Sequence, residues 1–508
     1  MADIESLFVQ VKQVNVRRAP RVARDNIIDT LVSGDVVEVL AAVAEESADG
    51  WRWRRLAESE EHWIAEVNRQ TGMRLFDTQP PETAEPAAPE TLYVLANAVN
   101  IRRGPQSTAD NILARLQRGE PIVLGAQKVV GADGWQWRPL ADKQDAWVAE
   151  YHTRSGQRLL GRKSPGKPLA GRVQTQGMQF LLDGQPLRFI GANLREFPFY
   201  GRSDVLPFAS ANIQDDQLRA MQEMGMRVVR MHACHRAVSL EEALPLVGAA
   251  LDRVQQHGLL AIVVLNDSLG SFWVPGDERF HRHVLGHLDK IDYFHAGGYR
   301  ENYLPYARRM VAAYRDHPAI LAWELGNEYA IHPQPASVAD GEAFLRFVEH
   351  VSGEIRGLDP NHLIAIGLVN SGHVAPNDQP GLDRLAFARR LYGLPAIDFL
   401  TVHFYEGNGE EENSRPDLRV ARELNKPLIV EEWGAKGGNR AALTASTIAD
   451  WTGQGAGGFL QWGLSATPFD VGVGDAEFGM DPYAGGNKDH YQNLKQVYHE
   501  WAVRLQQT

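Results

Sequence analysis

The sequence predicts a multidomain protein in which two small all-β barrels precede one α/β barrel of the (β/α)8 type. Three observations support this prediction. Residues 1–160 contain an internal repeat, and two proline-containing segments interrupt the chain. From Val173 to Thr508, short apolar runs alternate with amphipathic helical patterns, which is typical of a parallel sheet covered by helices.

Composition places the chain among ordinary globular proteins. With 508 residues, the chain is too long for a single hydrophobic core, so two or three domains are expected. Its residues are 44% hydrophobic and 23% charged. The formal net charge of −12 disfavours nucleic acid or an anionic membrane as the main partner, so a neutral substrate is the better match. The single cysteine, Cys234, excludes an internal disulfide, and its place after an apolar run favours a buried thiol.

The amino terminus predicts no targeting segment. Residues 1–10 lack the basic start and apolar core of a secretory signal. No apolar run approaches the roughly 18 residues of a membrane helix. We therefore expect a cytoplasmic protein, or a secreted one in its mature or trimmed form, with no membrane partner.

The repeat consists of matching segments at an offset of 84 or 85 positions. The pairs are 14–20 (VNVRRAP) with 99–105 (VNIRRGP), 49–53 (DGWRW) with 133–137 (DGWQW), and 63–66 (WIAE) with 147–150 (WVAE). Short alternating runs between Gly, Asp and Pro turns predict a small antiparallel barrel in each copy. These motifs resemble bacterial SH3-like domains. The resemblance implies contact with a cell wall, with a spacer or packing role as the alternative. We expect Trp51, Trp53 and their repeat partners in the core rather than as sugar platforms.

Two segments are predicted to be linkers because their composition cannot bury a core. Residues 78–90 combine prolines with Ala and Glu, and residues 161–172 combine prolines with basic residues. We therefore expect SH3-like domains at 1–77 and 91–160, and the large barrel at 173–508.

The barrel domain begins with a predicted hairpin at 179–190 that turns on Asp183-Gly184 and can plug the barrel floor. The strands are placed at Arg188–Ala192, Val228–Met231, Ala261–Leu265, Ile320–Trp323, Leu363–Gly367, Phe399–Val402, Leu428–Glu431 and Gly457–Gln461. Asp215 is expected to cap the helix that ends at Gly225. No Gly-rich phosphate turn follows the first strand, which disfavours a doubly wound open sheet.

Residues just past the strands of such a barrel form its active face. Those positions are Asn193, Arg230, Asn266, Glu328, His403, Tyr405, Glu432 and Trp462. The set is polar, aromatic and acidic, which suits a sugar site. Its two carboxylates, Glu328 and Glu432, predict glycoside hydrolysis, in which one acid protonates the leaving oxygen and the other attacks the sugar or activates water.

Neighbouring residues give these carboxylates different roles. Glu328 is expected to be the acid, with a raised pKa, and the amide of Asn327 can bond the hydroxyl next to the reacting carbon. Arg230 and Tyr405 are expected to hold Glu432 ionised as the nucleophile. Trp462 offers a flat face to a sugar ring.

Each assignment has an alternative reading. Glu431 is the rival nucleophile, but strand alternation turns it away from Glu432, and Glu324 is expected to be deeper and structural. His403 is a substrate-binding candidate whose alternative is a core histidine, and Trp462 could instead fill the barrel. Trp273 is a candidate aromatic subsite, with loop packing as the alternative.

In combination, Arg230, Asn327-Glu328, His403-x-Tyr405, Glu432 and Trp462 resemble glycoside hydrolase family 5, in the clan of retaining (β/α)8 (TIM-barrel) enzymes. The resemblance covers residues 173–502. The stretches most similar to endo-β-1,4-mannanases are 314–328, 397–403, 426–432 and 455–459. The resemblance to the family implies that Glu328 is the acid/base and that Glu432 is the nucleophile that forms a covalent glycosyl-enzyme. Tyr329 departs from the pattern, which often has Pro after Asn-Glu, and this departure concerns the subsites.

The leading hypothesis is an endo-β-1,4-mannanase that acts on polysaccharide or oligosaccharide by double displacement, without a cofactor or metal. An endo-β-1,4-glucanase or exo-β-mannosidase of the same fold is the enzymatic alternative, and an inactive carbohydrate- or cell-wall-binding protein is the other. The acidic stretches 406–413 and 470–481 lack EF-hand spacing, so we expect hydrated loops rather than calcium sites.

Overall fold

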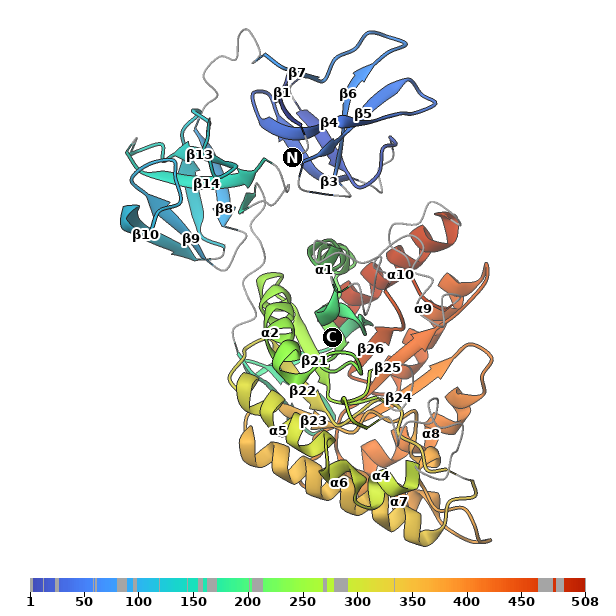
Figure 1. Cartoon of the computed structure of the whole chain (residues 1–508). Helices are drawn as coiled ribbons and strands as arrows, with labels where there is room; N and C mark the ends of the chain where they lie inside the picture. Colours follow the sequence, from blue (N-terminus) through green and yellow to red (C-terminus); the bar gives the residue numbers. More distant parts are fainter. Residues whose placement is uncertain are drawn as a thin grey trace. The chain divides into compact units, whose positions relative to one another are not determined.

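The computed structural model describes residues 3–507 apart from positions 12, 23–26, 58, 60–61, 80–88, 95–97, 118, 144, 154–158, 162–170, 201, 203–212, 268–271, 278–290, 333, 465–477 and 481–487. The chain forms two compact units, Met1–Pro168 and Leu169–Thr508 (Figure 1). Most of both predicted linkers, and most of the acidic stretch 470–481, lie outside the described residues. No described helix is long and apolar enough to cross a membrane.

The first unit is rich in strands, and its two halves share one strand order. The strands are β1 (Ile4–Val9), β2 (Gln13–Arg17), β3 (Ile27–Val32), β4 (Val36–Glu46), β5 (Trp51–Leu56), β6 (Trp63–Asn68), β7 (Phe76–Asp77), β8 (Glu90–Val94), β9 (Ala98–Arg102), β10 (Ile112–Gln117), β11 (Pro121–Leu124), β12 (Val129–Val130), β13 (Trp135–Pro139), β14 (Trp147–His152) and β15 (Leu160–Gly161). The first copy has the order β3-β2-β6-β5-β4-β1-β7. The second has β10-β9-β14-β13-β12 and β11-β8-β15, so β4 corresponds to β11 and β12 together.

Side chains of the second copy pack against the first. Tyr151 is buried in the core of the first copy. The backbone N–H of Glu38 donates to the carbonyl of Thr153 at 3.2 Å. Trp53 and Trp137 are almost fully buried, which confirms the core role predicted for this pair, whereas Trp51 and Trp135 are half-buried.

The second unit contains the predicted parallel eight-stranded barrel. Its strands are β19 (Phe189–Asn193), β20 (Val228–His232), β21 (Leu260–Val264), β22 (Ile320–Glu324), β23 (Leu363–Ala365), β24 (Leu400–Tyr405), β25 (Leu428–Gly434) and β26 (Gly458–Gln461). The sheet order is β23-β22-β21-β20-β19-β26-β25-β24. At the seam between β23 and β24, backbone hydrogen bonds join Asp398 to Ile364 and His403 to Val369, both at 2.9 Å. The sheet is therefore nearly closed.

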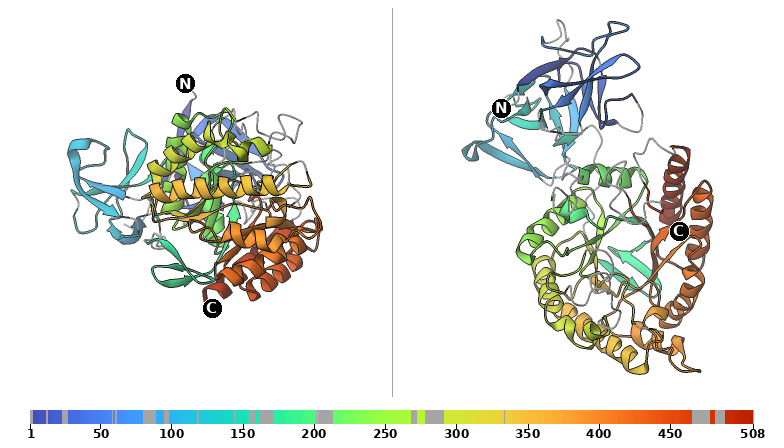
Figure 2. Two further views of the ribbon diagram at one scale, coloured as in Figure 1. Left: turned by 90° about the horizontal axis from the view of Figure 1, so that it is seen from below. Right: turned by 45° about the vertical axis from the view of Figure 1, so that its right-hand side comes forward.

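Helices lie around the outside of these strands (Figure 2). The described α-helices are α1 (Ile213–Glu223), α2 (Leu240–Gln256), α4 (Ile291–Ala296), α5 (Tyr303–Tyr314), α6 (Val338–Leu358), α7 (Arg384–Tyr392), α8 (Glu410–Leu424), α9 (Arg440–Gly453) and α10 (Lys488–Gln507). Ser239 begins α2 with a reciprocal capping box to Glu242.

Two local predictions are wrong. Asp215 does not cap a helix, because it lies inside α1, where its carboxylate pairs with Arg253 and His257 of α2. The stretch 406–413 is not a loop throughout, because α8 begins at Glu410 and places three glutamates in its first turn. Carboxylates at a helix N-terminus are stabilised by the helix dipole without a bound cation.

The predicted floor hairpin is present. β16 (Val173–Gln176), β17 (Gln179–Leu182) and β18 (Gln185–Leu187) form a small antiparallel sheet. Phe180 of β17 packs edge-on against Phe399 and lies in one apolar cluster with barrel residues such as Ile262 and Leu460. The hairpin therefore closes the amino-terminal end of the barrel and leaves the carboxyl ends of the strands for polar residues.

Candidate active site

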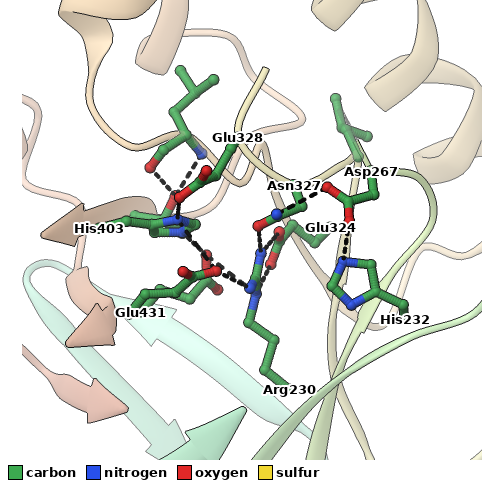
Figure 3. Close-up of polar contacts among 12 residues, drawn as sticks. Arg230, His232, Asp267, Glu324, Asn327, Glu328, His403 and Glu431 are labelled. Atoms are coloured by element: carbon green, nitrogen blue, oxygen red, sulfur yellow. Dashed lines mark hydrogen bonds and ion pairs between the residues drawn. The ribbon is translucent and has the colours of Figure 1, made fainter. Parts of the chain in front are cut away.

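A buried arginine on β20 joins polar side chains from four other barrel segments (Figure 3). Nε and Nη2 of Arg230 donate to the carboxylate of Glu324 at 3.0 and 2.5 Å. Nη2 also donates to Oδ1 of Asn327 at 2.7 Å. Nη1 donates to Oδ1 of Asn193 at 3.0 Å and to Oε1 of Glu432 at 2.7 Å. The contact between Arg230 and Glu432 expected from the sequence is present, and Glu324 is fully buried, as expected.

Glu328 lies on a sharp turn after β22. Its φ of 52° is in the left-handed region, which costs an L residue about 1 to 2 kcal/mol. Its backbone N–H donates to the carbonyl of Gly367 at 2.7 Å. Gly367 itself has a φ of 85°, and a side chain there would collide with Gly326 and the carboxylate of Glu324. The close approach of these two segments fixes the direction of the Glu328 side chain.

Tyr329 supports the same turn from the core. Its hydroxyl accepts a hydrogen bond from Nδ2 of Asn266 and donates to the carbonyl of Leu325, both at 3.2 Å. Its ring covers Gly326, where a side chain would meet the ring. Tyr329 is buried. The residue that departs from the family pattern therefore stabilises the turn beneath Glu328 and leaves no side chain of its own in the cleft.

His403 joins the carboxylates of three glutamates. Its Nδ1 lies 3.0 Å from Oε1 of Glu328 and 3.4 Å from Oε1 of Glu432. Its Nε2 lies 3.2 Å from Oε2 of Glu431. Burial lowers the pKa of His403, but the charge of Glu432 and the hydrogen bonds to Glu328 and Glu431 raise it to about 10. His403 is thus a buried cation of the site rather than a neutral core histidine.

Glu431 and Glu432 are consecutive, yet both reach this cluster. The pairing of β24 with β25 shifts between Val402↔Val430 and His403↔Glu432, so Glu431 is the extra residue of a β-bulge. The prediction that alternation turns Glu431 away is therefore wrong. Its carboxylate lies 3.6 Å from Nε of Arg230 and contacts the far side of the His403 ring.

The carboxylates of Glu328 and Glu432 face one another. One oxygen of each, together with a ring nitrogen of His403, lies in a group whose atoms are all within 4.8 Å of one another. Burial would raise the pKa of Glu328, but the hydrogen bond and charge of His403 outweigh it, so this pKa is lowered. Burial raises the pKa of Glu432, although His403, Arg230 and Tyr405 oppose it. Both directions are opposite to those expected from the sequence. His403 lowers the pKa of Glu328, whereas burial and the charge of Glu328 raise that of Glu432.

The aromatic candidates border this pair to different degrees. Tyr405 donates its hydroxyl proton to Oε2 of Glu432 at 2.5 Å, as expected. Its ring meets that of Trp462 edge-on at 6.3 Å. The guanidinium carbon of Arg195 lies 5.7 Å from the centre of the Trp462 ring. Trp273 is buried after β21, with its ring centre 5.3 Å from the guanidinium carbon of Arg236, and its role as a subsite stays a prediction.

Glu328, His403 and Glu432 are residue types that bind metal ions, but their protonation disfavours one. A histidine nitrogen must lose its proton before it can coordinate a metal. Both ring nitrogens of His403 face carboxylates, which stabilise its protonated form. The group is better suited to hold a proton than a metal ion.

Sequence reasoning missed two further residues of this region. Asp267 accepts a hydrogen bond from Nδ2 of Asn327 at 3.0 Å, and its other carboxylate oxygen lies 3.6 Å from Nε2 of His232 (Figure 3). Asp267 follows the predicted strand-end residue Asn266 directly. A search extended by one residue past each strand would have found it.

Residues 183–466 match the family model described as cellulase (glycosyl hydrolase family 5). The chain belongs to glycoside hydrolase family 5. The matched residues include the barrel strands from β19 to β26, and thus every segment that contributes to the site.

This family 5 chain is similar to fungal proteins named as mannan endo-1,4-beta-mannosidases. It is 26% identical over 358 residues to a probable mannan endo-1,4-beta-mannosidase F of Aspergillus flavus. That alignment covers 63% of this chain and 74% of the relative. It is 25% identical over 350 residues to a probable mannan endo-1,4-beta-mannosidase A of Aspergillus clavatus, with 65% and 93% covered. Among solved structures, the endo-1,4-beta-mannanase of Rhizomucor miehei superposes with a TM-score of 0.51 at 18% identity. That superposition covers 66% of this chain and all of the other, and it confirms the barrel fold.

Proposed function

We propose that this family 5 chain is a retaining glycoside hydrolase that cleaves internal β-1,4 linkages of mannan-type polysaccharides. The observation that carries the proposal is the placement of the Glu328 and Glu432 carboxylates within 4.8 Å of each other. Retaining enzymes keep their two carboxyl groups about 5 to 5.5 Å apart, whereas inverting enzymes leave room for a water at about 6.5 to 9.5 Å.

The contacts of the two carboxylates assign their roles. Glu432 receives hydrogen bonds from Arg230 and Tyr405, which orient one oxygen each and stabilise the ionised form. It is the nucleophile that forms the covalent glycosyl-enzyme. Glu328 receives a hydrogen bond from His403, and its side chain is 16% exposed, whereas that of Glu432 is 2% exposed. Glu328 is the acid/base, because that role requires exchange of protons with a leaving group and with water.

The proton for the leaving group is held jointly by His403 and Glu328. Substrate excludes water from Glu328, which raises its pKa and favours transfer along the 3.0 Å hydrogen bond from Nδ1 of His403. The charge of Glu432 is the main cause of the raised pKa of His403. As Glu432 attacks and loses that charge, His403 holds its proton less strongly, so proton delivery is coupled to formation of the glycosyl-enzyme bond.

Nucleophile rescue tests these roles. In E432A, azide takes the place of the carboxylate, and we expect an α-mannosyl azide product from 2,4-dinitrophenyl β-mannobioside. In E328A the first step proceeds with this activated leaving group, and azide should yield the β-azide. E412A, which removes an exposed glutamate of α8, is the matched control and should behave as the parent chain. Hydrolysis with inversion of the anomeric carbon, or full activity of either site variant, would contradict the proposal.

Identity to named mannan endo-1,4-beta-mannosidases supports the mannan substrate. Release of reducing ends from galactomannan, glucomannan and carboxymethylcellulose tests it. We expect turnover of the two mannans, and turnover of carboxymethylcellulose alone would favour the glucanase alternative. Products from mannohexaose separate endo from exo action, because release of monosaccharide alone from one end requires an exo-acting enzyme.

We infer that the two N-terminal copies are SH3-like modules that contact a cell wall. The repeated motifs and the shared strand order support a duplicated small β-fold. Sedimentation of the full E432A chain with insoluble peptidoglycan and with insoluble mannan tests the contact. Retention on peptidoglycan supports it, and retention on neither polymer favours a spacer role.

A further inference from the structure

Beside the two glutamates lies a buried pair, Asp267 and His232, that the mechanism above does not use. Asp267 follows β21, and His232 ends β20 (Figure 3). Both side chains are almost fully buried. Their nearest atoms, Oδ2 of Asp267 and Nε2 of His232, are 3.6 Å apart. The question is what a buried carboxylate at this position does.

Asp267 and Arg230 together hold the side-chain amide of Asn327 in one orientation. Nη2 of Arg230 donates to Oδ1 of Asn327 at 2.7 Å, and Nδ2 of Asn327 donates to Oδ1 of Asp267 at 3.0 Å. Exchanging the amide oxygen and nitrogen would place two donors against one another and two acceptors against one another. The backbone is held as well, because the N–H of Asn327 donates to the carbonyl of Asn266 at 2.8 Å.

This orientation leaves one donor of Asn327 for a substrate. A side-chain amide has two N–H groups, of which one is bonded to Asp267. Within the described part of the chain, the other has no acceptor. Asn327 directly precedes Glu328, so this N–H belongs to the turn that carries the acid/base.

His232 contributes no charge next to Asp267. Burial and the neighbouring charges of Arg230 and Arg195 lower the pKa of His232 well below its usual value, so the ring is neutral. Neither ring nitrogen of His232 has a hydrogen-bond partner among the described residues. The charge of Asp267 raises the pKa of Arg195, so the carboxylate acts on Asn327 as an ionised acceptor, and hydrogen bonds to ionised groups are the stronger kind.

We propose that Asp267 is a positioning residue, which fixes and polarises the amide of Asn327 so that its second N–H donates to the hydroxyl group next to the sugar carbon under attack. The inference rests on the proposed function, since it names a role within that reaction. A bond to this hydroxyl strengthens as the oxocarbenium-like transition state develops. Loss of Asp267 should therefore lower kcat more than it raises KM.

A pair of substrates isolates this role. The first is 4-nitrophenyl β-mannobioside, and the second lacks only the 2-hydroxyl group of the sugar that carries the nitrophenyl group. The measured quantity is kcat/KM for the complete substrate divided by kcat/KM for the analogue, determined with the full chain. In D267A we expect the ratio to fall roughly 10- to 100-fold, the effect of one hydrogen bond to a charged group. D267A should lose activity on the complete substrate and little on the analogue.

Two further variants make the result specific. D267N keeps a side-chain oxygen that can accept from Asn327, so it should retain a ratio within roughly 5-fold of the parent, because only the added strength of an ionised acceptor is lost. D359A removes another buried aspartate, whose carboxylate accepts from Nε1 of Trp323 at 2.8 Å and pairs with His362. This control should destabilise the barrel without changing the ratio.

The outcomes separate the inference from the proposed function. If the parent chain hydrolyses the complete substrate but D267A keeps the parental ratio, Asp267 has only a structural role and the inference is wrong. A ratio in D267N as low as in D267A would also overturn it, since an accepting oxygen would then not matter. If the parent chain hydrolyses neither this substrate nor mannan, the proposed function fails, and the inference fails with it.

Discussion

Replacement of Arg230 by methionine should destabilise the barrel strongly. The substitution keeps an unbranched side chain but removes a cation that lies within 3.6 Å of three buried carboxylates, those of Glu324, Glu431 and Glu432. Breaking a buried ion pair by removal of one partner costs about 3 to 5 kcal/mol. We expect a loss of at least this size in the free energy of unfolding at pH 8.

The loss should depend on pH in a definite direction. With Arg230 present, the pKa of Glu324 is already raised to about 8, by burial first and by Glu431 next, while Arg230 opposes both. Arg230 lowers the pKa of all three carboxyls, so without it each folded-state pKa rises: those of Glu324 and Glu432 from above the ordinary value of about 4.3, and that of Glu431 from below it. The unfolded chain then holds fewer protons than the folded one between about pH 4.5 and 8, so stability falls as pH rises. The loss at pH 5 should be smaller than at pH 8 by at least about 1.4 kcal/mol, which corresponds to one pKa unit.

Hydrogen exchange measured by mass spectrometry suits this test, because peptides from β20 to β22 report the barrel separately from the N-terminal unit. Lys426→Met is the matched control. Nζ of Lys426 donates to the carbonyls of Tyr392 and Ile397. Burial lowers the pKa of Lys426 and Asp398 opposes this, and we expect the lysine to be charged at both pH 5 and pH 8, so its loss should be equal at the two pH values. A loss for R230M below about 1 kcal/mol, or one that does not change with pH, would refute the reasoning.

Three further outcomes are expected. In H403Q the basic limb of kcat/KM against pH should move to lower pH. The proton for the leaving group then depends on Glu328 alone and no longer on a histidine with a pKa of about 10. An unchanged limb would contradict the proposal that His403 and Glu328 share this proton. In Y405F, the hydrogen bond that lowers the pKa of Glu432 is lost, so the acidic limb of kcat/KM should move to higher pH. On 4-nitrophenyl β-mannobioside, kcat/KM should also fall roughly 10-fold or more. In S239A, loss of the capping box should cost about 1 kcal/mol in hydrogen exchange of α2 and leave kcat/KM unchanged, and a change in kcat/KM would link α2 to the site.

The barrel could be predicted because its signals are local. Each strand is a short apolar run bounded by turn residues, and all eight predicted strands are present with ends shifted by up to three residues. The largest shifts are at the ends of β24 and β25, which continue to Tyr405 and Gly434. Contacts of Arg230 and Tyr405 with Glu432 were predictable for a further reason. A buried arginine needs a carboxylate partner, and strand ends of a closed barrel converge.

The features that escaped prediction depend on pairing between strands. The bulge at Glu431 requires the register of β24 against β25, which no single strand encodes. The direction of the Glu328 pKa depends on His403, a residue 75 positions away whose own pKa is raised by two further glutamates, Glu431 and Glu432. The sequence could place the carboxylates at one face of the barrel, but it could not show which charged side chains lie next to each of them.

The charges around the site explain why a mechanism that uses two carboxylates, Glu328 and Glu432, has two further buried glutamates beside it, Glu324 and Glu431. In the proposed mechanism, Glu432 becomes a neutral ester in the glycosyl-enzyme, and its ion pairs with Arg230 and His403 are lost. A buried Arg230 without a partner would be costly. Glu324 holds Arg230 through two hydrogen bonds, so this cation keeps a carboxylate throughout the reaction. The bulge places Glu431 against Nε2 of His403, so this histidine has a carboxylate partner when it takes up a proton again in the glycosyl-enzyme.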